Sequence, residues 1–169
     1  MKRHNISLIG MAACGKSTAG VLLAKTLGMM FVDTDLLIQQ KAGMLLAEIL
    51  SDCGIRRFLE IEDEVIRSLD VENTCVATGG SVVYSTAAME YLREISTIVY
   101  LAAPYDVIAR RIGDIKGRGV VIEPGKSLYE VYREREPLYR QYADVVVDTS
   151  GLGTEMVVTE ITEQIKNEP

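Results

Sequence analysis

The sequence predicts an α/β fold in which a five-stranded parallel sheet lies between two layers of helices. Short apolar and β-branched runs alternate with longer segments of helical spacing, the pattern of a three-layer α/β/α domain. Residues 10–17, Gly-Met-Ala-Ala-Cys-Gly-Lys-Ser, match the phosphate-binding motif G-x-x-x-x-G-K-[S/T], which needs a strand before it and a helix after it. The 169 residues, 48% of them apolar, suffice for one buried core, and we expect a single domain over 1–169.

Five segments are expected to be strands because they are short, apolar and rich in β-branched residues. They are residues 5–9, 30–32, 74–77, 97–101 and 143–147. Seven segments with helical spacing are expected to connect and cover them. They are residues 16–27, 34–42, 56–69, 86–93, 104–112, 127–142 and 153–166.

The first strand, loop and helix form the phosphate-binding unit. The glycines allow backbone N–H groups to surround phosphate oxygens at the positive end of the helix dipole. Lys16 is expected to reach the β and γ phosphates, and Ser17 to offer a hydroxyl to Mg²⁺, which prefers oxygen ligands. The residues expected to bind the nucleotide here are Gly10, Ala12, Ala13, Cys14, Gly15, Lys16, Ser17 and Thr18.

This motif alone does not say whether the phosphoryl group passes to water, a protein or a small molecule. A regulatory GTPase would also need Asn-Lys-x-Asp to read guanine. Lys166-Asn167 is the only pair of these two residue types in the chain, which argues against that class.

In the middle of the chain, two segments have unusual patterns. Helix 56–69 carries one apolar face that includes Phe58 and Val65, and Glu62 falls inside it, where a carboxylate needs a partner. Residues 113–125 contain four of the fourteen glycines and are too long for an ordinary connection in so small a domain. We interpret 113–125 as a mobile lid.

Charge and composition exclude several classes of partner. A net charge of −6 argues against non-specific binding to nucleic acid or to anionic membranes. Lys2-Arg3 and the apolar residues 6–14 imitate a secretory signal, but cleavage there would divide the phosphate loop, and no apolar run approaches the roughly 20 residues of a membrane span. We therefore expect a cytoplasmic protein.

The three cysteines, Cys14, Cys53 and Cys75, lack metal or redox spacing and are expected to be free thiols.

A series of further motifs accompanies the loop in a fixed order over nearly the whole chain. They are Leu27-Gly28, Phe31-Val32-Asp33-Thr34-Asp35, Gly54 and Phe58 before Glu62, Ala77-Thr78-Gly79-Gly80, Val99-Tyr100-Leu101, Arg135-Glu136-Pro137-Leu138-Tyr139, Ala143-Asp144 and Val147-Asp148-Thr149. In this order and spacing they resemble the shikimate kinase family. The resemblance implies a P-loop kinase of the nucleoside-monophosphate-kinase type, with a mobile lid.

The resemblance implies roles for the acidic and glycine motifs. Asp33 would bind Mg²⁺ through water beside Ser17, and Asp35 would accept a hydrogen bond from the attacking substrate hydroxyl. A helix start capped by Thr34 or Asp35 is the simpler interpretation, and both can hold, since ligands bind at the carboxyl ends of such strands. Gly79 and Gly80 would let the backbone approach the substrate, or they only form a tight turn.

The arginines receive their roles from the same resemblance. Arg135 would pair with the substrate carboxylate. If the Pro-Leu-Tyr motif near it is left out of account, the simpler interpretation of Arg135 is a solvated residue in a run of charged residues. Arg118 in the lid would contact the transferring phosphate, or it is an exposed loop arginine. Arg111 would pack on adenine, and Ser150 to Thr154 would complete the base pocket. His4, the only histidine, lies before the first strand and is expected at the surface.

Three positions depart from the family pattern. Leu59 stands where the family has an arginine that binds the substrate carboxylate, Ser81 replaces a third glycine, and Gly119-Val120-Val121 replaces Pro-Leu-Leu. Losing a hydrogen bond to a charged group costs about 1.5–3 kcal/mol, or roughly 10- to 100-fold in affinity. Arg56, about 60° away around the helix, could replace the lost guanidinium, or Leu59 simply widens the apolar stripe.

The sequence therefore predicts a small-molecule kinase. The expected reaction is the ATP- and Mg²⁺-dependent phosphorylation of a hydroxyl on a small carboxylated metabolite, with shikimate the leading candidate. Leu59 and Ser81 keep open another polyol or hydroxy acid as acceptor, and a nucleotide-binding module with little transferase activity is the alternative of a different class. The resemblance also implies a place in aromatic amino acid biosynthesis, and we expect a monomer.

Overall fold

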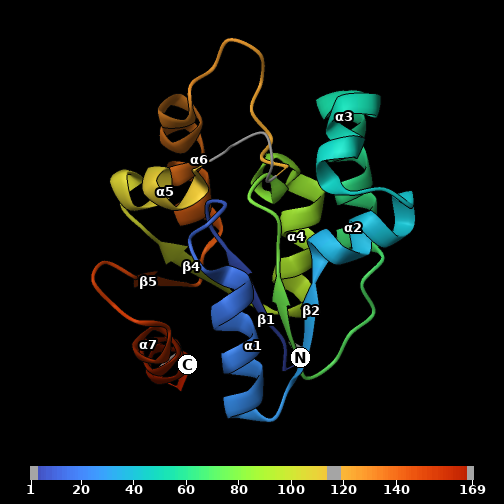
Figure 1. Ribbon diagram of the computed structural model, residues 1–169. Helices are drawn as coiled ribbons and strands as arrows, with labels where there is room; N and C mark the ends of the chain where they lie inside the picture. Colours follow the sequence, from blue (N-terminus) through green and yellow to red (C-terminus); the bar gives the residue numbers. More distant parts are fainter. Residues whose placement is uncertain (1–3, 114–118, 167–169) are drawn as a thin grey trace.

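The structure is a computed structural model that describes residues 4–113 and 119–166. At its centre lies a sheet of five parallel strands in the order β2-β3-β1-β4-β5 (Figure 1). The strands are β1 (Ile6–Ile9), β2 (Met30–Asp33), β3 (Thr74–Ala77), β4 (Thr97–Ala102) and β5 (Val145–Asp148). The predicted α/β fold and five-stranded parallel sheet are confirmed.

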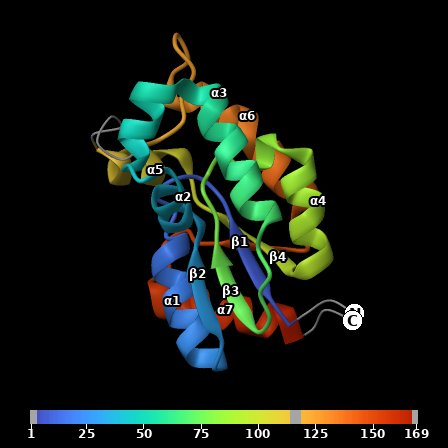
Figure 2. The same ribbon diagram turned by 90° about the vertical axis from the view of Figure 1, so that its right-hand side faces the viewer.

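Helices cover both faces of this sheet. Helices α1 and α7 pack together on one face, whereas α4 and α6 contact β4 on the other (Figure 2). This arrangement gives the three layers expected from the alternating pattern. The helices are α1 (Lys16–Leu27), α2 (Thr34–Ala42), α3 (Leu46–Arg67), α4 (Thr86–Ile95), α5 (Tyr105–Ile112), α6 (Leu128–Tyr142) and α7 (Thr154–Lys166), with a short 3₁₀ helix η1 (Val82–Tyr84).

The central strand β1 is apolar because both of its faces are covered. Ile6 pairs with Cys75 of β3 on one side and with Thr97 of β4 on the other, and every residue of β1 is buried. A parallel strand in this position has no solvent face, so it shows a continuous apolar run and no alternation. The strand ends at Ile9, directly before the phosphate loop.

Helix α3 is the main difference from the predicted elements. The expected helix 56–69 is the second half of α3, and an additional helical segment precedes it from Leu46. The chain breaks between the two halves at Gly54, whose φ of 76° and ψ of 170° are not helical. The first half was not predicted because no Ser, Thr, Asp or Asn marks its start. Instead, Glu48 accepts a hydrogen bond from the backbone N–H of Leu45 at 2.8 Å.

A second small core lies beside the main one, between α2 and α3. Its buried members include Ile38 of α2, Phe58 and Val65 of α3, and Val121 from the lid segment. Val121 is only 6% exposed, and a side chain added to Gly119 would lie 2.6 Å from Cβ of Leu46. Gly119 therefore lies against the first half of α3, and Val121 belongs to the small core that both halves share.

Smaller differences concern the ends of elements. The cap of α2 is Asp33, which accepts a hydrogen bond from the N–H of Asp35 at 3.0 Å, so neither Thr34 nor Asp35 is the cap. The last strand begins at Val145, and Asp144 before it accepts a hydrogen bond from the N–H of Ile98 at 2.8 Å. His4 is exposed, as predicted.

Within the described ranges, 4–113 and 119–166, no helix is long and apolar enough to cross a membrane. The three cysteines are free, with Cys14 and Cys75 buried and Cys53 exposed.

Candidate active site

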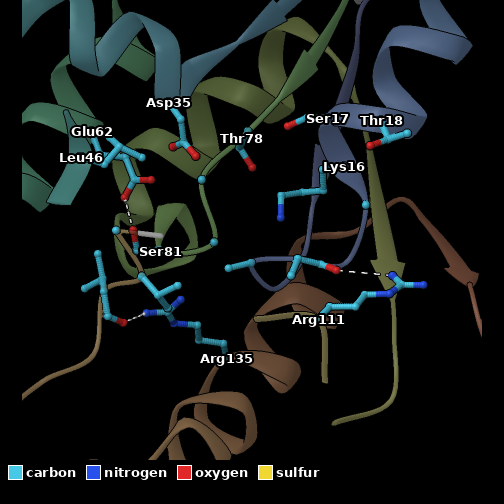
Figure 3. A pocket seen from close by; sticks show the side chains of 18 of the residues that line it. Lys16, Ser17, Thr18, Asp35, Leu46, Glu62, Thr78, Ser81, Arg111 and Arg135 are labelled. Carbon is cyan, nitrogen blue, oxygen red and sulfur yellow. Dashed lines mark hydrogen bonds between the residues drawn. The ribbon is translucent and has the colours of Figure 1, made fainter. Parts of the chain in front are cut away.

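Most of the predicted site residues that the structure describes line one cavity at the carboxyl ends of β1, β2 and β3 (Figure 3). The cavity has a volume of about 570 Å³ and lies where open parallel sheets bind ligands. It brings together the phosphate loop, the start of α2, the second half of α3, the turn after β3, the lid and α6. The predicted residues that line it are Ala12, Ala13, Gly15, Lys16, Ser17, Thr18, Asp35, Gly79, Gly80, Arg111 and Arg135.

The phosphate loop adopts backbone conformations that its glycines make possible. Gly10 has a φ of 146°, and a side chain there would lie 2.8 Å from the backbone oxygen of Leu101. Gly15 has a φ of 100° and directly precedes α1, so the helix begins at Lys16 with its N-terminus beside the cavity. Ala13 adopts a positive φ of 63° without being glycine. Such strain is common in loops shaped for a ligand.

Lys16 is buried within the loop, with 7% of its surface exposed. Its Nζ donates hydrogen bonds to the backbone oxygens of Gly10 and Met11, both at 2.7 Å. In Figure 3 the side chain points into the cavity between the loop and the turn after β3. The ammonium is thus held at the mouth of the loop, where a phosphate group can reach it.

Ser17 and Asp33 form a second polar pair beside Lys16. The Ser17 hydroxyl donates to Oδ2 of Asp33 at 2.7 Å, while Oδ1 of Asp33 caps α2. Asp33 therefore caps α2, a role that the sequence had assigned to Thr34 or Asp35, and it also places a carboxylate oxygen next to Ser17. Two adjacent oxygen ligands suit Mg²⁺, which keeps several waters and binds nucleotide phosphates. No group of three or more His, Cys, Asp or Glu within 4–113 and 119–166 is arranged to hold a metal.

Asp35 projects into the cavity from the first turn of α2 (Figure 3). Burial raises the pKa of Asp35 above its usual value and the neighbouring Asp33 raises it further, whereas Lys16 lowers it. A carboxylate in this setting has a high affinity for a proton or a hydrogen-bond donor.

Glu62, which the sequence placed on the apolar face of its helix, is buried at the back of the same cavity. Its Oε2 accepts a hydrogen bond from the Ser81 hydroxyl at 2.6 Å, and its Oε1 has no hydrogen-bond partner. Burial raises the pKa of Glu62 to about 7; the Ser81 hydrogen bond opposes this, and Asp35 adds to it. The partner that a buried Glu62 requires is therefore Ser81, one of the three positions that depart from the family pattern.

Gly79 separates Glu62 and Asp35. A side chain added to Gly79 would lie 2.4 Å from Oε1 of Glu62 and 2.9 Å from Oδ1 of Asp35. Only glycine fits between the two carboxylates, which explains one of the two glycines in this turn. Gly80 faces the other side, where an added side chain would lie 3.3 Å from Nη1 of Arg135.

Arg135 is 1% exposed, so its interpretation as a solvated residue is wrong. Its Nε donates to the Tyr84 hydroxyl at 3.1 Å, and its Nη2 donates to the backbone oxygen of Val121 at 2.5 Å. The guanidinium also lies 5.0 Å from the centre of the Tyr84 ring. These contacts fix its plane and turn Nη1 toward Gly80 and the cavity. No sequence pattern pointed to Tyr84, which is brought to Arg135 by the unpredicted helix η1.

The remaining predicted residues have different positions. Arg111 lines the cavity and donates to the backbone oxygen of Ala13 at 3.4 Å, which places it beside the loop. Thr154 also lines the cavity, whereas Ser150 does not. Arg118 lies outside the described residues. Gly10 and Cys14 belong to the loop without lining the cavity.

Arg56 is not brought to this site. Its side chain is 94% exposed and pairs with Glu60 at 3.3 Å on the surface of α3. Leu59 is half-buried and lines a neighbouring cavity of about 180 Å³ together with Ile55 and Tyr84. In this structure, then, Arg56 does not replace a guanidinium at position 59, and Leu59 extends an apolar surface.

Comparison with known proteins points to one family. A family model described as shikimate kinase matches residues 12–166. The chain is 39% identical over 160 residues to a shikimate kinase of Caldanaerobacter subterraneus, covering 93% of both chains, and 40% identical over 161 residues to one of Geobacter sulfurreducens, covering 94% of this chain and 88% of the other.

Solved structures agree with these sequence matches. A shikimate kinase from Acinetobacter baumannii in complex with shikimate superposes with a TM-score of 0.89 at 29% identity, covering 97% of this chain and 93% of that one. A shikimate kinase from Aquifex aeolicus gives a TM-score of 0.84 at 31% identity, covering 96% of each chain.

Proposed function

Because this chain belongs to the shikimate kinase family, we propose that it transfers the γ-phosphoryl group of ATP to a hydroxyl of shikimate. One observation carries the proposal. A single cavity holds a phosphate loop with its lysine, a buried carboxylate and a buried guanidinium, Lys16, Asp35 and Arg135. These groups match the three parts of a small-molecule kinase reaction, namely the phosphates, the attacking hydroxyl and the substrate carboxylate.

In the proposed reaction Asp35 positions the attacking hydroxyl. The hydroxyl oxygen forms a bond to the γ-phosphorus, the bond from that phosphorus to the bridging oxygen breaks, and ADP leaves. The hydroxyl proton passes to Asp35, whose raised pKa favours proton uptake. Catalysis then rests on positioning and charge stabilisation, as in other phosphoryl transfers.

The nucleotide half of the site would be formed by the loop and α5. Lys16 would leave its backbone acceptors for the β and γ phosphates, and Arg111 would lie along the adenine, with Ser150 contributing to the base pocket. Ser17 and Asp33 would hold Mg²⁺, since their oxygens already lie 2.7 Å apart at the mouth of the loop. When bound, Mg²⁺ offsets the negative charge of the phosphates. Arg118 would add a guanidinium at the transferring group.

The acceptor half would be formed by Arg135, Gly79 and Gly80. A guanidinium whose plane is fixed by Tyr84 and Val121 is prepared for a planar carboxylate, which loses less conformational entropy on binding than a flexible arginine would. We further propose that the protein acts as a cytoplasmic monomer that supplies phosphorylated shikimate to aromatic amino acid biosynthesis.

A coupled assay of ADP release with and without shikimate tests the proposal. We expect ADP release to require shikimate, and Lys16→Ala to lower turnover at least about 100-fold. Asp35→Asn should lower kcat by about 100-fold or more, because it removes the proton acceptor while ATP binding changes little. Glu72→Gln, at an exposed glutamate, is the control and should have no effect.

Two results would contradict this function. ADP release that is indifferent to shikimate would favour a nucleotide-binding module with little transferase activity. If Asp35→Asn weakened ATP binding as much as it slowed turnover, Asp35 would belong to the nucleotide half of the site.

A further inference from the structure

The two halves of the cavity meet at Gly80, in the turn after β3. A side chain on Gly80 would lie 3.1 Å from the backbone nitrogen of Ala12 and 3.6 Å from the backbone oxygen of Gly10. The turn therefore lies directly against the phosphate loop. In the proposed reaction the loop holds the phosphates and the turn lies along the acceptor, so the position of Gly80 relative to the loop affects how closely the two reactants approach.

Tyr139 of α6 reaches this junction from outside the cavity. Its hydroxyl donates a hydrogen bond to the backbone oxygen of Gly80 at 2.5 Å and lies 3.8 Å from Sδ of Met11 in the phosphate loop. The side chain is fully buried, and Tyr139 is not one of the described residues that line the cavity. Tyr139 therefore acts on a bound acceptor through the backbone that it holds.

The surroundings of Tyr139 keep its hydroxyl in one place and in its donor form. The ring stacks on that of Tyr100, with 5.1 Å between the ring centres and 25° between the planes. Tyr100 belongs to β4 and is paired with Ile9, the residue before the phosphate loop. Burial raises the pKa of Tyr139 well above its usual value, although Arg135 opposes this, so the hydroxyl keeps its proton.

Arg135 and Tyr139 are four residues apart on α6, so both project from the same face of this helix. Nη1 of Arg135 would lie 3.3 Å from a side chain on Gly80, and the backbone oxygen of Gly80 accepts the Tyr139 hydrogen bond. One turn of α6 thus places both the guanidinium proposed for the substrate carboxylate and the backbone beside it. The Tyr139 hydroxyl joins this helix turn to the backbone that faces the phosphate loop.

We propose that Tyr139 is a positioning residue for phosphoryl transfer, which holds the Gly80 turn against the phosphate loop and thereby aligns the acceptor hydroxyl with the γ-phosphate. The inference rests on the proposed function and adds a residue to it. Without the hydroxyl, Gly80 loses this donor and the turn can move away from Ala12. The acceptor would still bind Arg135 and Asp35, but less often with its hydroxyl oxygen in line with the phosphorus. A displacement of about 1 Å can lower a rate by roughly 100-fold, so a small shift has a large effect on kcat.

Tyr139→Phe tests this role, because phenylalanine keeps the ring and removes only the hydroxyl. Steady-state kinetics with ATP and shikimate should show kcat lowered at least about tenfold. The KM values for both substrates should stay within about twofold, since Lys16, Arg135 and the stack on Tyr100 are retained.

Tyr91→Phe is the matched control. The Tyr91 hydroxyl also donates to a backbone oxygen at 2.5 Å, that of Leu69, and Tyr91 is not among the described residues that line the cavity. Each variant loses one hydrogen bond of the same kind, so urea unfolding should show destabilisation in both. Only Tyr139→Phe should lower kcat, which separates alignment from stability. Equal changes of kcat in the two variants would show a structural role alone and overturn the inference.

Gly80→Ala disturbs the same junction from the other side and leaves Tyr139 unchanged. Its methyl group would lie 3.1 Å from the backbone nitrogen of Ala12, so the turn and the loop must move apart slightly. We expect kcat to fall with ATP binding retained, and the double variant with Tyr139→Phe to lose less than the product of the two single effects. If Tyr139→Phe does not fold, Gly80→Ala decides, and an unchanged kcat overturns the inference.

The remaining outcomes separate this inference from the proposed function. If the parent protein phosphorylates shikimate and Tyr139→Phe keeps its kcat, the inference is overturned and the proposed function stands. A loss confined to the KM for ATP would assign Tyr139 to the nucleotide half of the site and would also overturn the inference. If the parent protein does not phosphorylate shikimate, the proposed function fails, and the inference that rests on it fails as well.

Discussion

At the scale of single residues, Glu62 is a carboxyl group that this fold buries at an electrostatic cost. The carboxyl group is buried, bonded on one side to a neutral serine, and has a pKa raised to about 7. A folded-state pKa above the unfolded value means that folding favours the protonated form. The stabilisation is fully present below the unfolded pKa and is lost as the pH rises through about 7.

Glu62→Gln should therefore stabilise the protein at pH 8, where the parent must bury a charge. The gain should be on the order of 3 kcal/mol and should shrink as the pH falls toward 4.5, because the parent glutamate is then neutral as well. Urea unfolding at a series of pH values measures it. Glu72→Gln, at an exposed site, should show no such trend, and a gain independent of pH would point to packing as the cause.

Leu59 and Arg56 give a second prediction at this scale. Leu59→Arg should lower the KM for shikimate, because it places another guanidinium one turn before Glu62 and close to the acceptor site. Arg56→Ala should leave KM within about twofold, since Arg56 is exposed and pairs only with Glu60 among its described ion pairs.

Steady-state kinetics of the two variants and of the double variant test this assignment. If Arg56→Ala harmed the parent more than the Leu59→Arg variant, Arg56 would compensate for the missing arginine in solution, contrary to its position here.

At the scale of elements, the break in α3 determines how this helix reaches both the site and the lid. The second half carries Phe58 and Glu62, and the first half carries Leu46, against which Gly119 packs. The two halves meet at Gly54, whose φ of 76° and ψ of 170° lie in a region that is essentially restricted to glycine. One glycine thus sets the angle between the half of α3 that carries Phe58 and Glu62 at the cavity and the half that contacts Gly119.

Gly54→Ala should lower the free energy of unfolding by about 1–3 kcal/mol and raise the KM of the acceptor, because straightening the break would displace Leu46 and the lid. Urea unfolding and steady-state kinetics measure the two effects. Gly43→Ala, at an ordinary left-handed helix end with a φ of 68°, is the comparison and should cost only about 1 kcal/mol with KM unchanged. Equal effects on KM would exclude the break as a determinant of the site.

At the scale of the whole molecule, a chain of polar contacts links the lid to the acceptor site. Arg135 donates to the backbone oxygen of Val121, and the Tyr84 hydroxyl donates to Glu134 at 2.5 Å. Lys126 pairs with both Glu123 and Glu134 at 2.8 Å, so the end of the lid is tied to α6. A ligand that engages Arg135 therefore acts on a residue that already holds the lid.

Hydrogen exchange should show this link. We expect the amides of residues 120–123 to exchange faster than those of β1, and to gain at least about tenfold protection when ATP and shikimate are both present, because ligands bridge the loop, Arg135 and the lid. Arg135→Lys should reduce this gain. Protection equal to that of the core before any ligand is added would contradict the prediction of a mobile lid.

The sequence by itself determined the parts of this protein that depend on local pattern. The phosphate loop, the five parallel strands and six of the helices could be predicted nearly as they occur, because turns, caps and periodic burial are properties of neighbouring residues. Through the family resemblance it also pointed to Asp35, Gly79 and Arg135, and the structure places all three at one cavity.

The tertiary structure alone decided which distant groups become partners. Ser81 meets Glu62 across 19 residues, and Tyr84 meets Arg135 across 51, in contacts that no local pattern encodes. Likewise, only the break at Gly54 and the path of α3 show that Arg56 points to solvent. Periodicity gives the face on which a residue lies, but its partner depends on how the elements pack, and the raised pKa of Glu62 follows from that packing.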